Sequence, residues 1–199
     1  MSNHQELRYP TKLQLTGDII FAPRDAEDGT GLIRAFFFDT VTGSVTAHLV
    51  SACTDEERDG WFTIRHMPAA TCPLRLFDRG DEYMRRVPEE VDGSGPGATV
   101  MDWVDMMYSG VGVVQRLDLL RRRGLLVGLT YLGENKGWHR FDVRFKFTEE
   151  DINILPPTQS LVNFEGILER QDVDGVPIIR THQLDLIGMA DPALIDILR

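Results

Sequence analysis

The segment WHRFDVRFKF, residues 138–147, alternates apolar and charged side chains over nearly its whole length. Its apolar positions are Phe141, Val143, Phe145 and Phe147. Its charged positions are Arg140, Asp142, Arg144 and Lys146. A period of two is what a β-strand produces, because successive side chains point to opposite faces of the sheet. The segment therefore predicts a β-rich fold in which a sheet has one face on a core and one face toward water.

Further strands and hairpins are predicted along the chain. KLQLTGDIIFA, from Lys12, predicts a strand, and residues 32–52 predict a hairpin that turns near Thr42 and Gly43. WFTIRHM, residues 61–67, predicts a short strand. The strongest hairpin signal is DVDG, which separates the apolar segments LVNFEGILERQ and VPIIRTHQLDLI.

The segment MDWVDMMYSGVGVVQRLDLLRRRG, residues 101–124, predicts a central helix. Thr99 is a candidate N-cap, and apolar residues recur at helical spacing at Trp103, Met107, Val111 and Val114. Gly110 and Gly112 each weaken a helix by about 1 kcal/mol relative to alanine, so we expect a kink there. Three arginines and Gly124 are placed to end the helix.

These elements together predict an α+β fold. We expect β-rich sheets, or a partly open barrel or sandwich, packed around one central kinked helix. Asp191-Pro192 predicts a short C-terminal helix that ends near Leu198. We expect a flexible N-terminus at residues 1–11 and a single domain at 12–199, with a sub-boundary in the Gly/Pro-rich hinge 88–98. The sequence shows no internal repeat.

Composition narrows the classes of function. The net charge is -10, which disfavours direct binding of nucleic acid or anionic lipid when it is averaged over the surface. No apolar run approaches the roughly 18 residues of a transmembrane helix, and the N-terminus has no apolar stretch like that of a signal peptide. Two cysteines, Cys53 and Cys72, are too few for a disulfide framework or a zinc cluster. We therefore expect a cytoplasmic protein that is not secreted.

The sequence shows no recognisable catalytic, metal-binding or cofactor-binding motif. The five histidines are scattered, although His48 and His66 lie on predicted strands that could face each other. No two histidines have metal-ligand spacing, and no nucleophile elbow, phosphate loop or dinucleotide fingerprint is present. We expect no catalytic residue, no metal and no cofactor. The sequence favours a non-enzymatic protein without excluding an enzyme.

Two groups of residues are candidates for binding. The first is the aromatic and methionine-rich group in the predicted helix, which either packs in the core or forms a docking surface: Trp103, Met106, Met107 and Tyr108. The second is an arginine group, offset by Asp118, which either ends the helix or binds anionic partners if many copies act together: Arg116, Arg121, Arg122 and Arg123.

The order of elements from Thr99 to residue 188 resembles the matrix proteins of rhabdoviruses. The matching segments are WVDMMYSG, RRRGLLVGLTYL, WHRFDVRF, NILPPTQ and FEGILERQDVDGVPIIRTHQL. The resemblance implies a viral structural protein of the virion and host cytoplasm. It would self-associate and link a nucleocapsid to the inner face of a membrane. The aromatic and methionine-rich group would contact protein partners, and the arginine group would contact nucleocapsid protein or anionic lipid.

Two other functions remain open from the residues themselves. A β-barrel or sandwich could bind or transform a small apolar molecule in a pocket lined by Phe36, Phe37, Phe38, Trp61 and Phe62. A nucleic-acid-binding β module would have aromatics for stacking. Its positive groove is hard to place on so acidic a chain.

Overall fold

The structure is a computed structural model that describes residues 8–22, 32–39, 44–51, 60–79, 82–87 and 104–199. The described part of the N-terminal half contains strands β1 (Lys12–Phe21), β2 (Leu32–Asp39), β3 (Ser44–Ser51), β4 (Gly60–Ala70), β5 (Leu74–Leu76) and β6 (Met84–Arg86). The C-terminal half contains β7 (Met107–Asp118), β8 (Arg123–Tyr131), β9 (Trp138–Lys146), β10 (Ser160–Gln171) and β11 (Pro177–Met189). A 3-10 helix at Glu150–Ile154 and helix α1 (Pro192–Leu198) complete the described elements.

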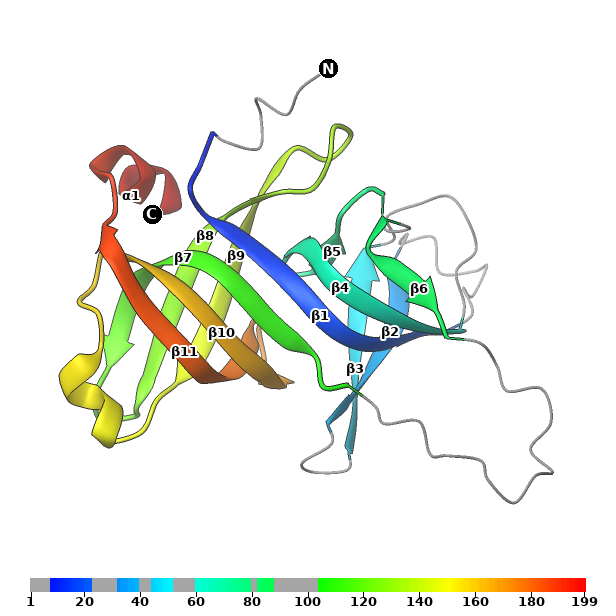
Figure 1. Cartoon of the computed structure of the whole chain (residues 1–199), viewed down its shortest axis with the longest axis horizontal. Helices are drawn as coiled ribbons and strands as arrows, with labels where there is room; N and C mark the ends of the chain where they lie inside the picture. The colour runs from blue at the N-terminus through cyan, green and yellow to red at the C-terminus, as the bar shows by residue number, and fades with distance from the viewer. Residues whose placement is uncertain (1–7, 23–31, 40–43, 52–59, 80–81, 88–103) are drawn as a thin grey trace.

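Ten of the eleven described strands form two five-stranded barrels of the same topology (Figure 1), and β6 pairs with β4 outside the first ring. In the first barrel β1 pairs with β2 and β4, β2 with β3, and β4 with β5, all antiparallel, while β3 pairs with β5 in parallel. The second barrel repeats this ring with β7, β8, β9, β10 and β11, and its parallel pair is β9 with β11. A five-stranded Greek-key barrel closed in this order is an OB-fold. The chain therefore repeats one topology although its sequence shows no repeat.

The first strands of the two barrels pair with each other. Lys12 to Thr16 of β1 run antiparallel to Val111 to Met107 of β7. Farther along, the same edge of β1 pairs with β2, and the same edge of β7 pairs with β8. The opposite edges pair with β4 and β10. Each first strand therefore belongs to its own barrel and to the junction between the barrels.

The predicted central helix is wrong, and with it the α+β class, because residues 107–118 form β7. Burial along this segment has a period of two: Tyr108, Gly110 and Gly112 are buried, whereas the residues between them are half-buried. A side chain at Gly110 would collide with the carbonyl of Lys12 on the paired strand. Gly110, which we expected to help kink a helix, instead lies where the backbone of β1 comes close, and Gly112 is a buried strand position.

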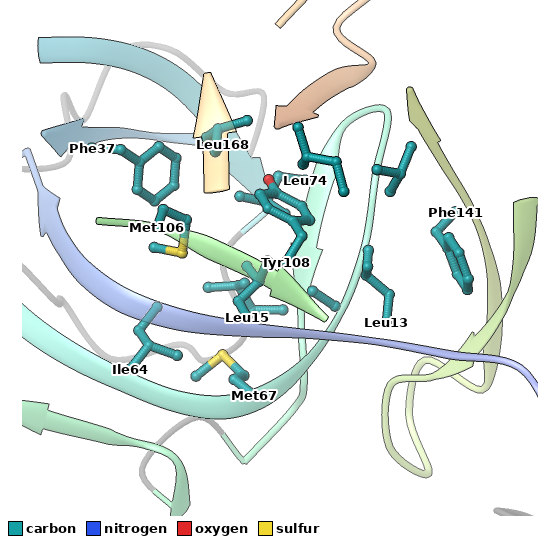
Figure 2. Close-up of a cluster of buried hydrophobic side chains, with 14 of the residues drawn as sticks. Leu13, Leu15, Phe37, Ile64, Met67, Leu74, Met106, Tyr108, Phe141 and Leu168 are labelled. Carbon is teal, nitrogen blue, oxygen red and sulfur yellow. The ribbon is translucent and has the colours of Figure 1, made fainter. Parts of the chain in front are cut away.

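The barrel interiors are filled by side chains, and one continuous cluster extends through both barrels. Figure 2 shows Tyr108 and Met106 of the β7 region among Leu13 and Leu15 of β1 and Ile64 of β4. On the side of the second barrel the cluster includes Phe141, Phe145 and Phe164. The alternation predicted for residues 138–147 is confirmed, since the apolar positions of β9 point into this core.

Other predictions from turn and cap signals are confirmed. DVDG joins β10 to β11, which pair antiparallel, and Gly175 in the turn has φ +78°. The predicted hairpin at residues 32–52 is the pair β2 and β3, although its turn lies outside the described residues. Asp191 accepts a hydrogen bond from the backbone N–H of Ala193 at 2.8 Å and begins α1. The hinge proposed at 88–98 also lies outside the described residues, and the single-domain assignment stays a prediction.

Two threonines of the first half cover strand edges of the second barrel. The Thr11 hydroxyl donates to the Leu129 carbonyl and accepts from the Leu129 N–H, both at 2.9 Å, where β8 extends beyond its pairing with β7. The Thr71 hydroxyl donates to the Asp142 carbonyl at 2.9 Å and accepts from the Asp142 N–H at 2.8 Å. Both hydroxyls are buried, so each replaces a missing strand partner and ties the barrels together.

We expect Thr71→Val to lower the free energy of unfolding by about 1–3 kcal/mol, because it leaves the N–H and C=O of Asp142 buried without partners. Valine keeps the shape of threonine, so packing changes little. Urea unfolding followed by circular dichroism measures the change, with the exposed Thr158→Val as the matched control. Equal stability of the two variants would contradict this role of Thr71.

Candidate ligand face of the second barrel

OB barrels bind ligands on the outer face of their second and third strands, between the loops that follow strands one and four. In the second barrel these strands are β8 and β9, and the two loops are residues 119–122 and 172–176. The outward positions of β8 pair with the outward positions of β9 in five registers. They are Arg123 with Lys146, Leu125 with Arg144, Val127 with Asp142, Leu129 with Arg140, and Tyr131 with Trp138. These ten residues are called the β8–β9 face below.

Cations line the β9 side of this face. Arg140, Arg144 and Lys146 occupy three of its outward positions, and their side chains are 39%, 39% and 36% exposed. Asp142 occupies the outward position between Arg140 and Arg144. Arg140 is paired with Asp142 at 3.0 Å, Arg144 with Asp172 at 2.5 Å, and Lys146 with Glu169. The ion pairs of Arg140 and Lys146 are partly exposed on both sides, so an anionic ligand can compete for these two cations at small cost. The side chain of Asp172 is only 8% exposed, so releasing Arg144 would leave a buried carboxylate without this partner.

The predicted arginine group lies at one end of the same face. Arg121 and Arg122 are in the turn between β7 and β8, Arg123 begins β8, and Arg116 lies beside that turn on β7. Arg121 contacts Asp118 at 3.8 Å and Arg122 contacts Glu149 at 2.7 Å. The structure therefore gathers the four arginines, but at a hairpin turn and not at the end of a helix.

Aromatic side chains lie at the other end. Trp138 packs against Tyr131, with ring centroids 5.6 Å apart, and edge-to-face against Tyr9, with centroids 4.9 Å apart. The guanidinium of Arg8 lies 5.3 Å from the centre of the Tyr9 ring. All three rings are half-buried. Sequence reasoning missed this cluster, because Tyr9 lies in a segment that we expected to be flexible.

The aromatic and methionine-rich group does not gather on a surface. Met106 and Tyr108 are in the core, 2% and 1% exposed, and burial raises the pKa of the Tyr108 phenol. Met107 is half-buried, and Trp103 lies outside the described residues. For Met106 and Tyr108 the core alternative of the sequence analysis therefore describes the structure.

The candidate pocket and the candidate histidine pair lead to no site within the described residues. Phe37 and Phe62 are core residues, whereas Phe36 and Trp61 are half-buried on strands β2 and β4. The side chains of Phe38 and His48 are outside what the structure describes, and His66 is exposed. No group of three or more His, Cys, Asp or Glu side chains that could hold a metal occurs in the described ranges.

The acidity of the chain does not come from the barrels. The described residues carry 19 Lys and Arg against 18 Asp and Glu, whereas the other residues carry 2 against 13. Residues 104–199, which contain the second barrel and α1, carry 11 Lys and Arg against 14 Asp and Glu, so this half is much less acidic than the chain as a whole. The argument that nucleic acid is an unfavourable partner depended on the net charge of the whole chain, and it weakens for a face where cations gather.

Comparison with known proteins finds a likeness among solved structures. No protein-family model matches the chain, and no curated protein matches it. The chain is similar to a deletion mutant of the single-stranded DNA binding protein from Thermus aquaticus, with 13% sequence identity, 93% of this chain and 98% of that chain covered, and a TM-score of 0.41. A TM-score this low does not establish a shared fold, so the assignment of two OB barrels depends on the strand pairing.

The predicted function as a matrix-like assembly protein is corrected. It depended on a central helix that presents a docking surface, and that segment is a barrel strand with Met106 and Tyr108 in the core. The resemblance to rhabdovirus sequences is itself not tested by these findings. Among the described residues, no helix has the length and hydropathy of a membrane span.

His139 lies where the barrels meet and makes stability depend on pH. Arg75 Nη1 lies 2.7 Å from Nδ1 of His139, and since arginine only donates, Nδ1 accepts and Nε2 donates to the Lys136 carbonyl at 2.9 Å. Burial, followed by the charge of Arg75, lowers the pKa of His139. The unfolded chain then binds this proton more readily than the native protein does.

We therefore expect the native state to lose stability as the pH falls below about 6.5, the pKa of an unperturbed histidine. The effect is absent above that pH, where both states are neutral at this site. Urea midpoints at about pH 7.5 and 5.5 measure it in the wild type and in His139→Gln, with exposed His182→Gln as the control. The loss should be smaller in His139→Gln, and equal losses in all three proteins would contradict the assignment.

Proposed function

We propose that this protein binds single-stranded nucleic acid along the β8–β9 face of its second barrel. One observation carries the proposal. The face has an outward row of cations on β9 and at the β7–β8 turn, and an aromatic cluster at its far end, where an OB barrel receives its ligand.

The spacing of the cations suits an extended polyanion. Alternate residues of a strand are about 7 Å apart, so Arg144 and Lys146 can follow a phosphate backbone, and Arg140 lies about 14 Å from Arg144 on the far side of Asp142. Arg123 and the turn arginines continue this row past the end of β9. A neutral oligosaccharide, which is another ligand class of OB barrels, would gain nothing from these charges.

The aromatic cluster favours a single strand over a duplex. Bases can stack on Trp138, Tyr131 or Tyr9 only when they are unpaired, and such stacking tolerates any base sequence. We therefore expect weak sequence preference and strong salt dependence. Self-association, which the sequence analysis also expected, stays a separate prediction.

Fluorescence anisotropy with a labelled oligothymidylate of about 20 nucleotides tests the proposal. The dissociation constant should rise steeply with salt, and a duplex of equal length should bind more weakly. Each phosphate contact contributes about 0.7 to the slope of log affinity against log salt for a single strand. Absence of binding at low salt would reject the proposal.

We expect Arg123→Ala to weaken oligothymidylate binding by about 3- to 10-fold at low salt and to reduce the salt slope by about 0.7, because one phosphate contact is lost. Arg85→Ala is the matched control, since Arg85 is exposed on β6 of the first barrel. Equal effects of the two substitutions would show that binding does not involve the β8–β9 face.

We expect Trp138→Leu to weaken binding by about 5-fold or more with little change in the salt slope, because a stacked base is worth about 1–3 kcal/mol and carries no ion. The same anisotropy titration measures both quantities. A thermal unfolding curve checks that the variant is folded. A reduced slope at unchanged low-salt affinity would contradict stacking at this position.

A further inference from the structure

Helix α1 lies on the outer surface of the second barrel next to the proposed ligand face. A second hydrophobic cluster forms there between Leu194 and Leu198 of the helix and Val113 and Val127 of the strands beneath. Val113 and Val127 are outward residues of β7 and β8, yet they are only 3% and 1% exposed. The helix therefore covers the centre of the surface on which an OB barrel binds its ligand.

The helix also accepts a hydrogen bond from Arg140, a cation of that face. The Leu198 carbonyl accepts hydrogen bonds from Arg140 Nη1 at 2.6 Å and from Gln115 Nε2 at 3.2 Å. Arg140 belongs to the β9 row that would bind phosphate, and Gln115 is an exposed residue of β7. A phosphate at Arg140 and the Leu198 carbonyl would compete for the same guanidinium.

The attachment of α1 is slight. The helix has seven residues, a length that is unstable in isolation, and only Leu194 and Leu198 of its side chains are buried. Ile197 on its outer side is 52% exposed. Both observations suit an element that can leave the barrel without unfolding it, because few contacts hold it.

We infer that α1 is a displaceable cover of the β8–β9 face, which competes with single-stranded nucleic acid and opens when the ligand binds. This inference rests on the proposed function. Closure hides the outward valines and holds Arg140. Opening releases Arg140 and uncovers an apolar strip beside the cation row, so that bases and phosphates of one strand are received side by side.

Two measurements test the cover with oligothymidylate as the probe. Hydrogen exchange of the wild-type protein should become faster at the amides of α1 when the oligonucleotide is saturating. The double variant Leu194→Ala, Leu198→Ala should bind more tightly than the wild type, by about tenfold if the cover is closed nine-tenths of the time. Ile197→Ala, on the exposed side of the same helix, should bind as the wild type does.

The possible results distinguish a failure of the α1 inference from a failure of the proposed nucleic-acid binding. If the wild type binds the oligonucleotide but exchange at α1 is unchanged, or if the folded double variant binds no more tightly, the cover is rejected and the proposed function stands. If neither protein binds, both are rejected. If only the double variant binds, the native protein does not bind the oligonucleotide, so the proposed function and the displaceable cover are both rejected. If the double variant does not fold, exchange in the wild type decides alone.

Discussion

The antiparallel pairing of β1 with β7 is the constraint on which the rest of the structure depends. Along one edge, the N-terminal part of each strand pairs with the other strand, and the C-terminal part pairs with the next strand of its own barrel. The backbone approach at this junction is close enough that Gly110 admits no side chain, because a Cβ atom would meet the Lys12 carbonyl. Gly17 has the same role on β1, since a Cβ atom there would lie 2.6 Å from the Asp105 carbonyl. Asp18 next to it accepts from the Val104 N–H at 3.0 Å and holds the chain at the start of β7.

Sharing the first strands leaves edges that each barrel cannot pair internally. Thr11 and Thr71 satisfy these edges from the other half of the chain, and the Arg75–His139 contact lies in the same region. The barrel interiors are meanwhile filled by aromatic and aliphatic side chains, so an internal ligand would have to displace core residues. Function is therefore left to the outer faces, where the strand register sets the spacing of charges and rings.

Most strands and turns could be predicted from the sequence, but the closure of the strands into barrels could not. Alternation in residues 138–147, the DVDG turn and the Asp191 cap are local signals, and each corresponds to the element observed. Residues 107–118 were misassigned because two of the inward positions of β7 are glycines, which carry no hydrophobic signal, while the half-buried Met107 and Val111 happen to have helical spacing. The charged row of β9 was visible as a strand face. Its role as a candidate site was not, because strand pairing alone brings it beside Tyr131, the turn arginines and α1.

The net charge of the chain is likewise a poor guide to the charge of one surface. A net charge of -10 suggests repulsion from nucleic acid, but the described barrels are almost neutral and the excess acid belongs to the other segments. A polyanion responds to charges within about a Debye length, near 8 Å at physiological salt, and hardly to the average over a protein. Arg144 and Lys146 lie within that distance of each other along β9, and Asp142 lies between Arg144 and Arg140, so these local charges and not the net charge of the chain set the field. The ion pairs of Arg140 and Lys146 are partly exposed, whereas Arg144 is paired with Asp172, whose side chain is buried. The Arg140 guanidinium also donates to a carbonyl of the seven-residue helix α1. The resident partners of Arg140 are thus a partly exposed carboxylate and a carbonyl of a short helix, which are contacts that another anion can replace at small cost.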